Sequence, residues 1–176
     1  MSGYGNRVFR AMKLEPELYE EVEADRTANG QAILTVVLSS LAAGVSGAVS
    51  GSYKGLLLHT GVALLGWVVW AFLSYIIGSK LLPEPQTKAD MGELLRCTGF
   101  SSAPGLLQVF GFLPGLGAPI RFVVSIWMLA AFVLAVRQAL DYTSTWRALG
   151  VCAIGWLVLM SLNVLLFLMS MGRLTL

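Results

Sequence analysis

Five long stretches without a charged residue constrain this sequence more than any other feature. A helix needs about 20 apolar residues to cross the hydrocarbon core of a bilayer, because each residue advances it by about 1.5 Å. Four stretches meet this length, and the shorter run at 122–136 lies between two arginines that can reach the headgroups from a longer helix. We therefore predict an all-α integral membrane protein, a bundle of five transmembrane helices at about residues 31–50, 55–79, 92–113, 119–140 and 146–172.

The composition excludes two other classes of protein. Charged residues make up 12% of the chain, whereas a soluble domain usually carries roughly 25%. Hydrophobic residues make up 56%, which excludes an intrinsically disordered chain. The net charge of +2 is too small to indicate nucleic acid as a partner. The expected surroundings of the protein are therefore a lipid bilayer.

The basic residues predict how the chain crosses the membrane. An N-terminus in the cytoplasm puts nine Lys and Arg residues on that side and three on the other. Cytoplasmic loops carry the excess of Lys and Arg, so the N-terminus is expected inside and the C-terminus outside. All ten acidic residues also fall inside. We expect a multi-pass protein, in the inner membrane if the source is a bacterium, with a protein partner at its cytoplasmic face.

Residues 1–30 precede the first predicted span. They contain no apolar core of the kind found in a cleaved signal peptide, so we predict a cytoplasmic amphipathic arm. Val8, Phe9 and Met12 recur at helical spacing among basic residues and are expected to anchor the arm to the membrane surface. Two interpretations stay open. The arm is either a solvated helix that rests on the bilayer or the cytoplasmic loops, or a docking arm for a soluble partner.

The sequence contains no pattern typical of an enzyme. It has neither H-E-x-x-H nor a Walker loop, and no Gly-x-Ser-x-Gly elbow. The single histidine, His59, has no Cys or carboxylate within one helical turn, so no metal site is expected. Cys97 and Cys152 are expected to be free thiols on the reducing side. We predict a protein without cofactor or catalytic activity.

Two pairs of charged residues lie near the inner ends of predicted helices. Arg137 and Asp141 are four apart, and Glu93 and Arg96 are three apart, so each pair could form an ion pair on one helix face. The alternative is that these side chains belong to a site for a partner or ligand. Every charged residue lies within about two turns of a predicted helix end, whereas a transporter usually places ionisable residues at mid-membrane.

Small residues recur every four positions on the first predicted helix, at Ser39, Ala43, Gly47 and Gly51. Such a ridge lets two helix backbones approach closely in a membrane. It serves packing either inside the bundle or between protomers of a homo-oligomer, and both interpretations stay open.

The third predicted helix contains Pro104 followed by Gly105. Proline removes one backbone hydrogen bond and clashes with the preceding turn. We predict a buried kink or break at residues 102–105, which forms either a functional pocket or a plain packing kink. Gln108 and Asn163, the polar residues deeper in the spans, indicate interhelical hydrogen bonds more than an ion path.

The same segment carries a family resemblance. Residues 99–104, Gly-Phe-Ser-Ser-Ala-Pro, are similar to the Gly-Tyr-x-x-x-Pro motif of the Yip-domain family, the Ypt/Rab-GTPase-interacting membrane proteins, with Phe for Tyr. That family combines a cytosolic N-terminal arm with five membrane helices, and the resemblance extends from about Asn6 to Gly172. The family's acidic-Leu-Tyr-Gly-Pro segment has no equivalent here. The compact arm and the run at 137–141 resemble small bacterial members.

The resemblance implies a function in membrane organisation. Eukaryotic relatives act in vesicle traffic and bind prenylated Rab GTPases, so we expect a non-enzymatic scaffold or adaptor that organises membrane or recruits partners at its cytoplasmic face. The alternative is a small transporter or channel that uses the broken third helix near Pro104. The candidate residues for a partner or ligand site are Gly99, Phe100, Pro104, Glu93, Arg96, Arg137 and Asp141.

Overall fold

All regular elements in the described part of the chain are helical. The computed structural model describes residues 3–46 and 53–173, in which there is no strand. Seven α-helices are accompanied by two 3-10 segments, η1 and η3, and one π-helical segment, η2. In chain order the elements are α1 (Tyr4–Met12), α2 (Pro16–Ala24), η1 (Arg26–Ala28), α3 (Asn29–Ser46), α4 (Tyr53–Ile76), η2 (Ile77–Leu81), α5 (Met91–Phe100), η3 (Ala103–Phe112), α6 (Gly117–Ala139) and α7 (Thr145–Arg173).

Within the described residues, three helical segments are long and apolar enough to cross a membrane. They are Arg26–Val45, Lys54–Leu81 and Gly117–Ala139, and Thr145–Ser161 in α7 is a shorter apolar helix. The prediction of an all-helical chain is thus confirmed. The span predicted at 92–113 is not one α-helix, because α5 ends at Phe100 and a 3-10 segment begins at Ala103.

The break in this span lies at Ser101 and Ser102, where the predicted interval begins. Pro104 lies in the first turn of η3, where its missing amide hydrogen costs least. The hydroxyls of Ser101 and Ser102 donate to the carbonyls of Thr98 and Gly99 at 2.7 and 2.5 Å. Such side-chain donors help to satisfy backbone groups where a membrane helix is interrupted.

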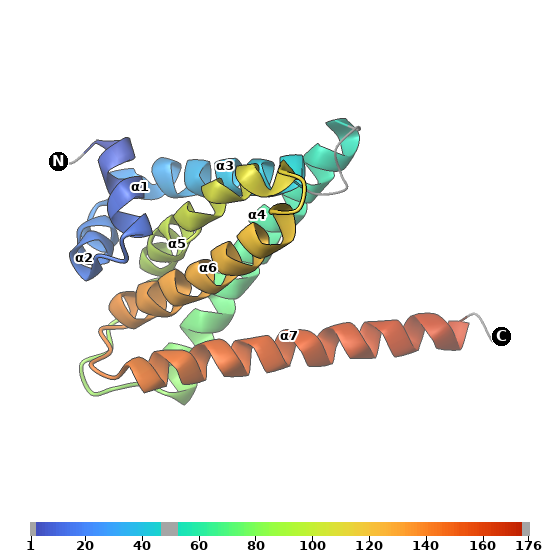
Figure 1. The fold of residues 1–176 in the computed structure, drawn as a ribbon. Coiled ribbons are helices and arrows are strands. Elements are labelled where there is room, and N and C mark those ends of the chain that lie inside the picture. Colours follow the sequence, from blue (N-terminus) through green and yellow to red (C-terminus); the bar gives the residue numbers. More distant parts are fainter. Residues whose placement is uncertain (1–2, 47–52, 174–176) are drawn as a thin grey trace.

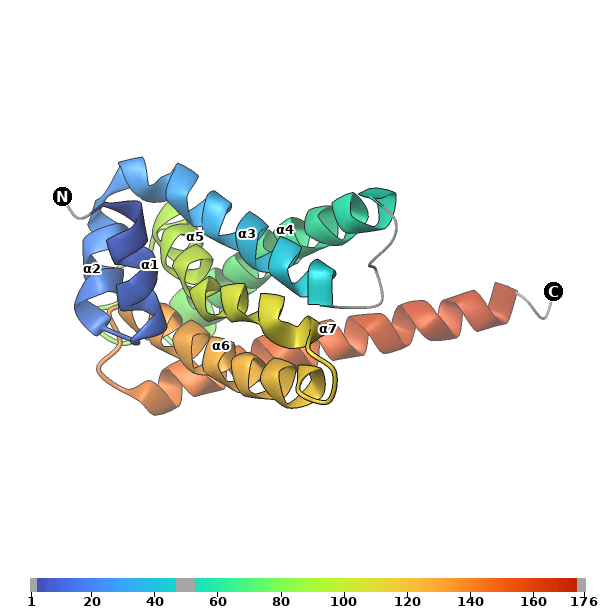
Figure 2. The same ribbon diagram turned by 45° about the horizontal axis from the view of Figure 1, so that its top comes forward.

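The broken helix lies at the centre of the bundle. Figures 1 and 2 show α3 running along α5 and η3, while α6 lies on another side of these two segments. Helix α4 packs against α3 and α5. Helix α7 packs on α4, η2 and α6, and its C-terminal half then extends away from the other helices. The break is therefore enclosed by elements from most of the chain.

The N-terminal arm is folded onto this bundle. Helix α2 packs against α5 and α6, and α1 packs against α2, α5 and η3, as seen at the left of Figure 1. The indole nitrogen of Trp127 in α6 also donates to the carbonyl of Met12 at 2.9 Å. Three side chains of α2 are fully buried in the shared core, namely Leu18, Tyr19 and Val22.

The three residues predicted to anchor the arm in the membrane surface have different surroundings. Val8 is buried within the protein and Met12 packs against its core. Phe9 is 56% exposed, and the Nζ atom of Lys13 lies 4.6 Å from the centroid of its ring. Because α1 turns one face toward the bundle, Val8 faces protein, and Phe9 is the member of the set that remains able to meet lipid headgroups.

The described part of the small-residue ridge on α3 faces the bundle. Ser39 is buried, and a Cβ atom placed on Gly105 of η3 would overlap its hydroxyl. Ala43 lines a cavity between the helices. These contacts place α3 close to the broken helix within one chain. Gly47 and Gly51 lie outside the described residues.

Candidate functional site

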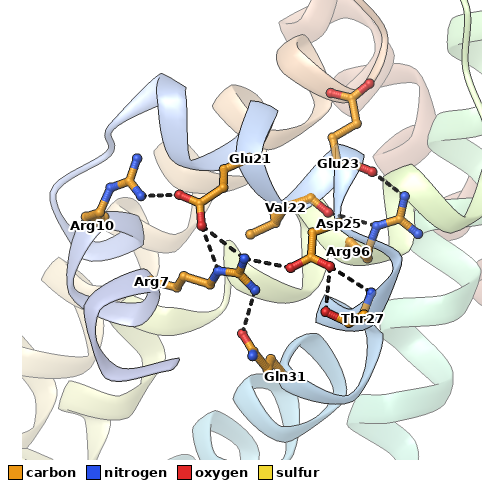
Figure 3. Close-up of polar contacts among 9 residues, drawn as sticks. All are labelled: Arg7, Arg10, Glu21, Val22, Glu23, Asp25, Thr27, Gln31 and Arg96. Atoms are coloured by element: carbon orange, nitrogen blue, oxygen red, sulfur yellow. Dashed lines mark hydrogen bonds and ion pairs between the residues drawn. The ribbon is translucent and has the colours of Figure 1, made fainter. Parts of the chain in front are cut away.

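One end of the bundle gathers most of the polar contacts. It is formed by α1, α2, the loop at 82–90 and the loop at 140–144, and is called the arm end below. Two buried arginines organise it, one from α5 and one from α1 (Figure 3).

Arg96 in α5 closes the C-terminal end of α2. Its side chain is almost fully buried; Nε donates to the carbonyl of Val22 at 2.8 Å, and a terminal nitrogen donates to the carbonyl of Glu23. The other terminal nitrogen lies 3.3 Å from Oδ1 of Asn29. The last carbonyls of a helix have no helical donor and carry the negative end of its dipole. A guanidinium supplies the missing hydrogen-bond donors and also a positive charge. Arg96 therefore holds α2 to α5.

Arg7 in α1 is the second buried arginine, and it joins α1, α2 and α3. Its guanidinium donates to the carboxylates of Glu21 and Asp25 at 3.0 and 2.7 Å, and to Oε1 of Gln31 at 3.0 Å (Figure 3). Arg10 donates to the other oxygen of Glu21 at 2.5 Å. Charge-assisted bonds of this kind are stronger than neutral ones and fix the geometry of both partners.

The carboxylates at the arm end have pKa values shifted in opposite directions. The pKa of Asp25 is lowered to about 2, because its carboxylate accepts hydrogen bonds from Thr27 and Arg7. The pKa of Glu23 is raised to about 7, chiefly by burial and further by the nearby charges of Asp141, Glu93 and Glu20. Glu23 is thus the carboxyl whose charge changes near neutral pH.

The raised pKa of Glu23 predicts a dependence of stability on pH. The pKa of Glu23 is higher in the folded protein than the ordinary 4.5. The contribution of Glu23 to the free energy of unfolding is therefore complete below pH 4.5 and is lost as the pH rises through about 7. Wild-type protein in detergent micelles is expected to melt at a lower temperature at about pH 8 than at about pH 5. Glu23→Gln is expected to flatten this slope, whereas Glu17→Gln, at an exposed position of the same helix, is expected to retain it. An unchanged slope in Glu23→Gln would assign the pH dependence to other groups.

A polar hollow of about 740 Å³ opens at the arm end between α2, the two loops and the end of α6. The amide of Gln138 donates to Glu20 at 2.7 Å on one side of it. Gln86 donates to the backbone carbonyl of Asp141 at 3.0 Å on the other side. Lys88 is exposed at this hollow. The hollow therefore combines both signs of charge with amide groups.

The two ion pairs considered from spacing alone are replaced by other contacts. Arg137 donates to the backbone carbonyls of Tyr142 and Thr143 at 3.2 and 3.4 Å. No salt bridge joins it to Asp141, because α6 ends at Ala139 and the two positions do not share one helix face.

The second pair is separated by local capping. Glu93 accepts from the backbone amide of Asp90 at 2.9 Å and completes a capping box at the start of α5. Arg96 instead binds the carbonyls of α2. Glu93 and Arg96 thus each stabilise a helix end, whereas Arg137 and Asp141 line the polar hollow.

Gly99, Phe100 and Pro104 lie in the protein interior. A Cβ atom on Gly99 would lie 2.7 Å from the Cβ of Ala32, so α5 and α3 approach too closely there for a side chain. Phe100 has no exposed surface. These residues position the broken helix against α3, while Ser102 beside them lines a cavity.

The chain matches the Yip1 domain over residues 13–166. The chain belongs to the Yip1 domain family. The Yip1 domain is a multi-pass membrane domain, related to vesicle-traffic Yip proteins, and its family consists generally of non-catalytic membrane proteins. This protein is accordingly an integral multi-pass membrane protein. No curated protein and no solved structure matches the chain.

The structure offers the Yip1 domain no evident metal centre within the residues it describes. Among them, no group of three or more His, Cys, Asp or Glu side chains could hold a metal ion. Cys97 and Cys152 are buried and unpaired with each other.

Arg7 is a main connector of the Yip1 domain's arm, and no sequence pattern predicts this role. Its partners Glu21 and Asp25 lie outside its own helix. No periodicity within one helix relates these positions. Helix α1, which carries Arg7, also precedes the residues matched by the family.

Proposed function

We propose that this Yip1 domain protein is a non-enzymatic scaffold or adaptor that recruits a protein partner at its cytoplasmic face. It crosses the membrane with five segments, of which α5 and η3 together form the third. Its N-terminus lies in the cytoplasm and its C-terminus outside. The distribution of nine Lys and Arg residues against three supports this orientation.

The observation that carries the proposal is the rigid polar surface at the arm end. Arg7 and Arg96 hold α1 and α2 in place through bonds that also involve α3 and α5. A surface whose parts are already ordered loses less entropy on binding a partner. The hollow beside Gln138, Lys88 and Asp141 supplies charges and amides that a soluble protein can recognise.

Proximity labelling tests the orientation and the adaptor function together. A labelling peroxidase fused at the N-terminus is expected to tag cytoplasmic proteins, and the same enzyme at the C-terminus is expected to tag none of them. Lys88→Glu should reduce the set tagged by the N-terminal fusion, because it reverses a charge at the hollow. Lys54→Glu, the same change at an exposed position outside the arm end, should leave that set unchanged. Equal labelling from both termini would refute the orientation, and an unaffected Lys88→Glu set would refute recruitment at this surface.

A small transporter or channel is a second candidate, favoured by one observation. The break in the third span borders a cavity lined by Ser101, Ser102 and Gln108. A solute path would need this cavity to be free of a resident ligand. Identifying what occupies the cavity therefore tests the transporter or channel alternative.

A further inference from the structure

A cavity of about 770 Å³ lies beside the break, among α3, α4, α6 and α7. Ligand sites typically enclose about 300–1,000 Å³. Protein interiors otherwise contain few voids larger than a water molecule. We propose that this cavity holds one acyl chain of a membrane phospholipid from the leaflet opposite the arm end. The proposal is independent of the adaptor function.

The wall of the cavity is suited to a hydrocarbon chain. Trp67, Trp70, Phe132 and Met128 contribute large apolar surfaces to it, and the rings of Trp70 and Phe132 meet edge to face with centroids 5.6 Å apart. Among the described residues that line it, none is Asp, Glu, Lys or Arg. An ion would be poorly solvated there, since a charge needs compensating partners in an apolar site.

The cavity opens sideways toward the bilayer. Leu129 on α6 is 58% exposed and Trp156 on α7 is 53% exposed, and both line it. These two helices are apolar, so their exposed flanks face lipid in a multi-pass membrane protein. Helix α7 also diverges from the bundle (Figure 2), which leaves its flank accessible from the lipid side. A phospholipid chain can therefore enter without crossing water.

Most hydroxyl groups in the wall are already engaged within their own helices. Ser40, Thr98 and Ser102 donate to the carbonyls three or four residues earlier, at 2.8, 2.5 and 2.5 Å. Trp67 donates its indole hydrogen to the hydroxyl of Thr98 at 3.0 Å. The wall therefore offers few free donors along its length, as a site for an alkyl chain requires.

Two polar groups of the wall, those of His59 and Gln108, lie toward the end opposite the arm. His59 is in the first third of α4, and its buried Nδ1 has no hydrogen-bond partner in the described structure. Gln108 is in η3, and its amide nitrogen reaches only the sulfur of Met128, at 3.5 Å. Sulfur is a weak acceptor. An ester carbonyl of a phospholipid would accept a hydrogen bond from Gln108, which places the headgroup at this end and the chain along the tryptophans.

Photocrosslinking in vesicles tests the proposal. The full chain is reconstituted in phosphatidylcholine that includes a phosphatidylcholine with a diazirine in the middle of one acyl chain, and adducts are mapped by peptide mass spectrometry. Adducts are expected on the inward residues Trp70 and Phe132 as well as on outward ones. Ala63→Phe, which places a ring in the cavity, is expected to lower the inward adducts about ten-fold. Ala130→Phe, the same change on an exposed site of α6, is expected to preserve them.

The outcomes separate the acyl chain from other occupants. Adducts confined to outward residues in the wild type would overturn the proposal, whether or not Ala63→Phe folds. Inward adducts that persist in a folded Ala63→Phe would overturn it too. Gln108→Leu adds no ring to the cavity but removes the proposed contact with the ester carbonyl. The inward adducts are therefore expected to shift along α4. An unchanged adduct map would overturn the placement of the headgroup. A dimer crosslinked through Trp156 with no inward adducts would show that a second copy covers the mouth instead.

Discussion

Arg7→Met is expected to release the N-terminal arm and to lower the free energy of unfolding by about 3 kcal/mol. The side chain of Arg7 is 3% exposed and compensates the carboxylates of Glu21 and Asp25, which are 30% and 12% exposed. Removing it leaves two partly buried negative charges without their main partner. The lower end of the range of about 3–5 kcal/mol for such losses applies, because Glu21 retains access to water.

Unfolding in mixed micelles and limited proteolysis both measure this effect. Cleavage between α1 and α3 should accelerate in Arg7→Met, because α2 loses the connection to α1 and Gln31. Arg10→Met is the matched control, since the side chain of Arg10 is 21% exposed and its loss should cost less than about 1 kcal/mol. Equal effects of the two changes would show that burial of Arg7 does not strengthen its contacts.

Gly99→Ala is expected to destabilise the bundle by about 1–3 kcal/mol, because α5 and α3 meet at this position without room for a methyl group. The added Cβ would lie 2.7 Å from the Cβ of Ala32 and 3.2 Å from its Cα. The obstacle is therefore partly backbone, so rotation of a side chain cannot relieve it. The two helices would have to separate, and the break at Ser101 would move with α5.

A second change identifies the cause. Ala32→Gly in the Gly99→Ala background should restore part of the lost stability, as it removes one of the colliding atoms. Gly61→Ala on α4 is the control, because a Cβ there meets nothing within 4 Å and alanine favours helix by about 1 kcal/mol over glycine. Thermal unfolding of the purified variants supplies all three values. If Ala32→Gly gives no rescue, the close approach of α3 is not the source of the cost.

Local chemistry made several features predictable. The 3-10 segment after Ser102 follows from Pro104 and Gly105, which weaken an α-helix wherever they occur. The capping box at Asp90 and Glu93 was not predicted, although it too depends only on neighbours three residues apart. Such features need only the chain within one or two turns.

Spacing failed where the relevant geometry was not a continuous helix. Arg137 and Asp141 are four apart, but α6 ends between them and Asp141 adopts a left-handed φ of 53°. The spacing of Val8, Phe9 and Met12 predicts one set at the membrane surface, yet Val8 is buried within the protein. In the first case the helix ends before the spacing applies, and in the second case the rest of the protein packs against the face of α1 that carries Val8.

The sequence by itself determined the helical class, the three long apolar spans found among the described residues, and the region of the break. Each of these depends on backbone hydrogen bonds and side chains within a single helix, which a run of neighbouring residues specifies. Only the tertiary structure decided which arginines are buried and where the cavity lies. Arg96 binds the carbonyl of Val22, 74 residues away, and a carbonyl is the same in every residue. Because a backbone acceptor cannot be identified from the residue type, its pairing with a distant arginine is known only once the helices are packed together.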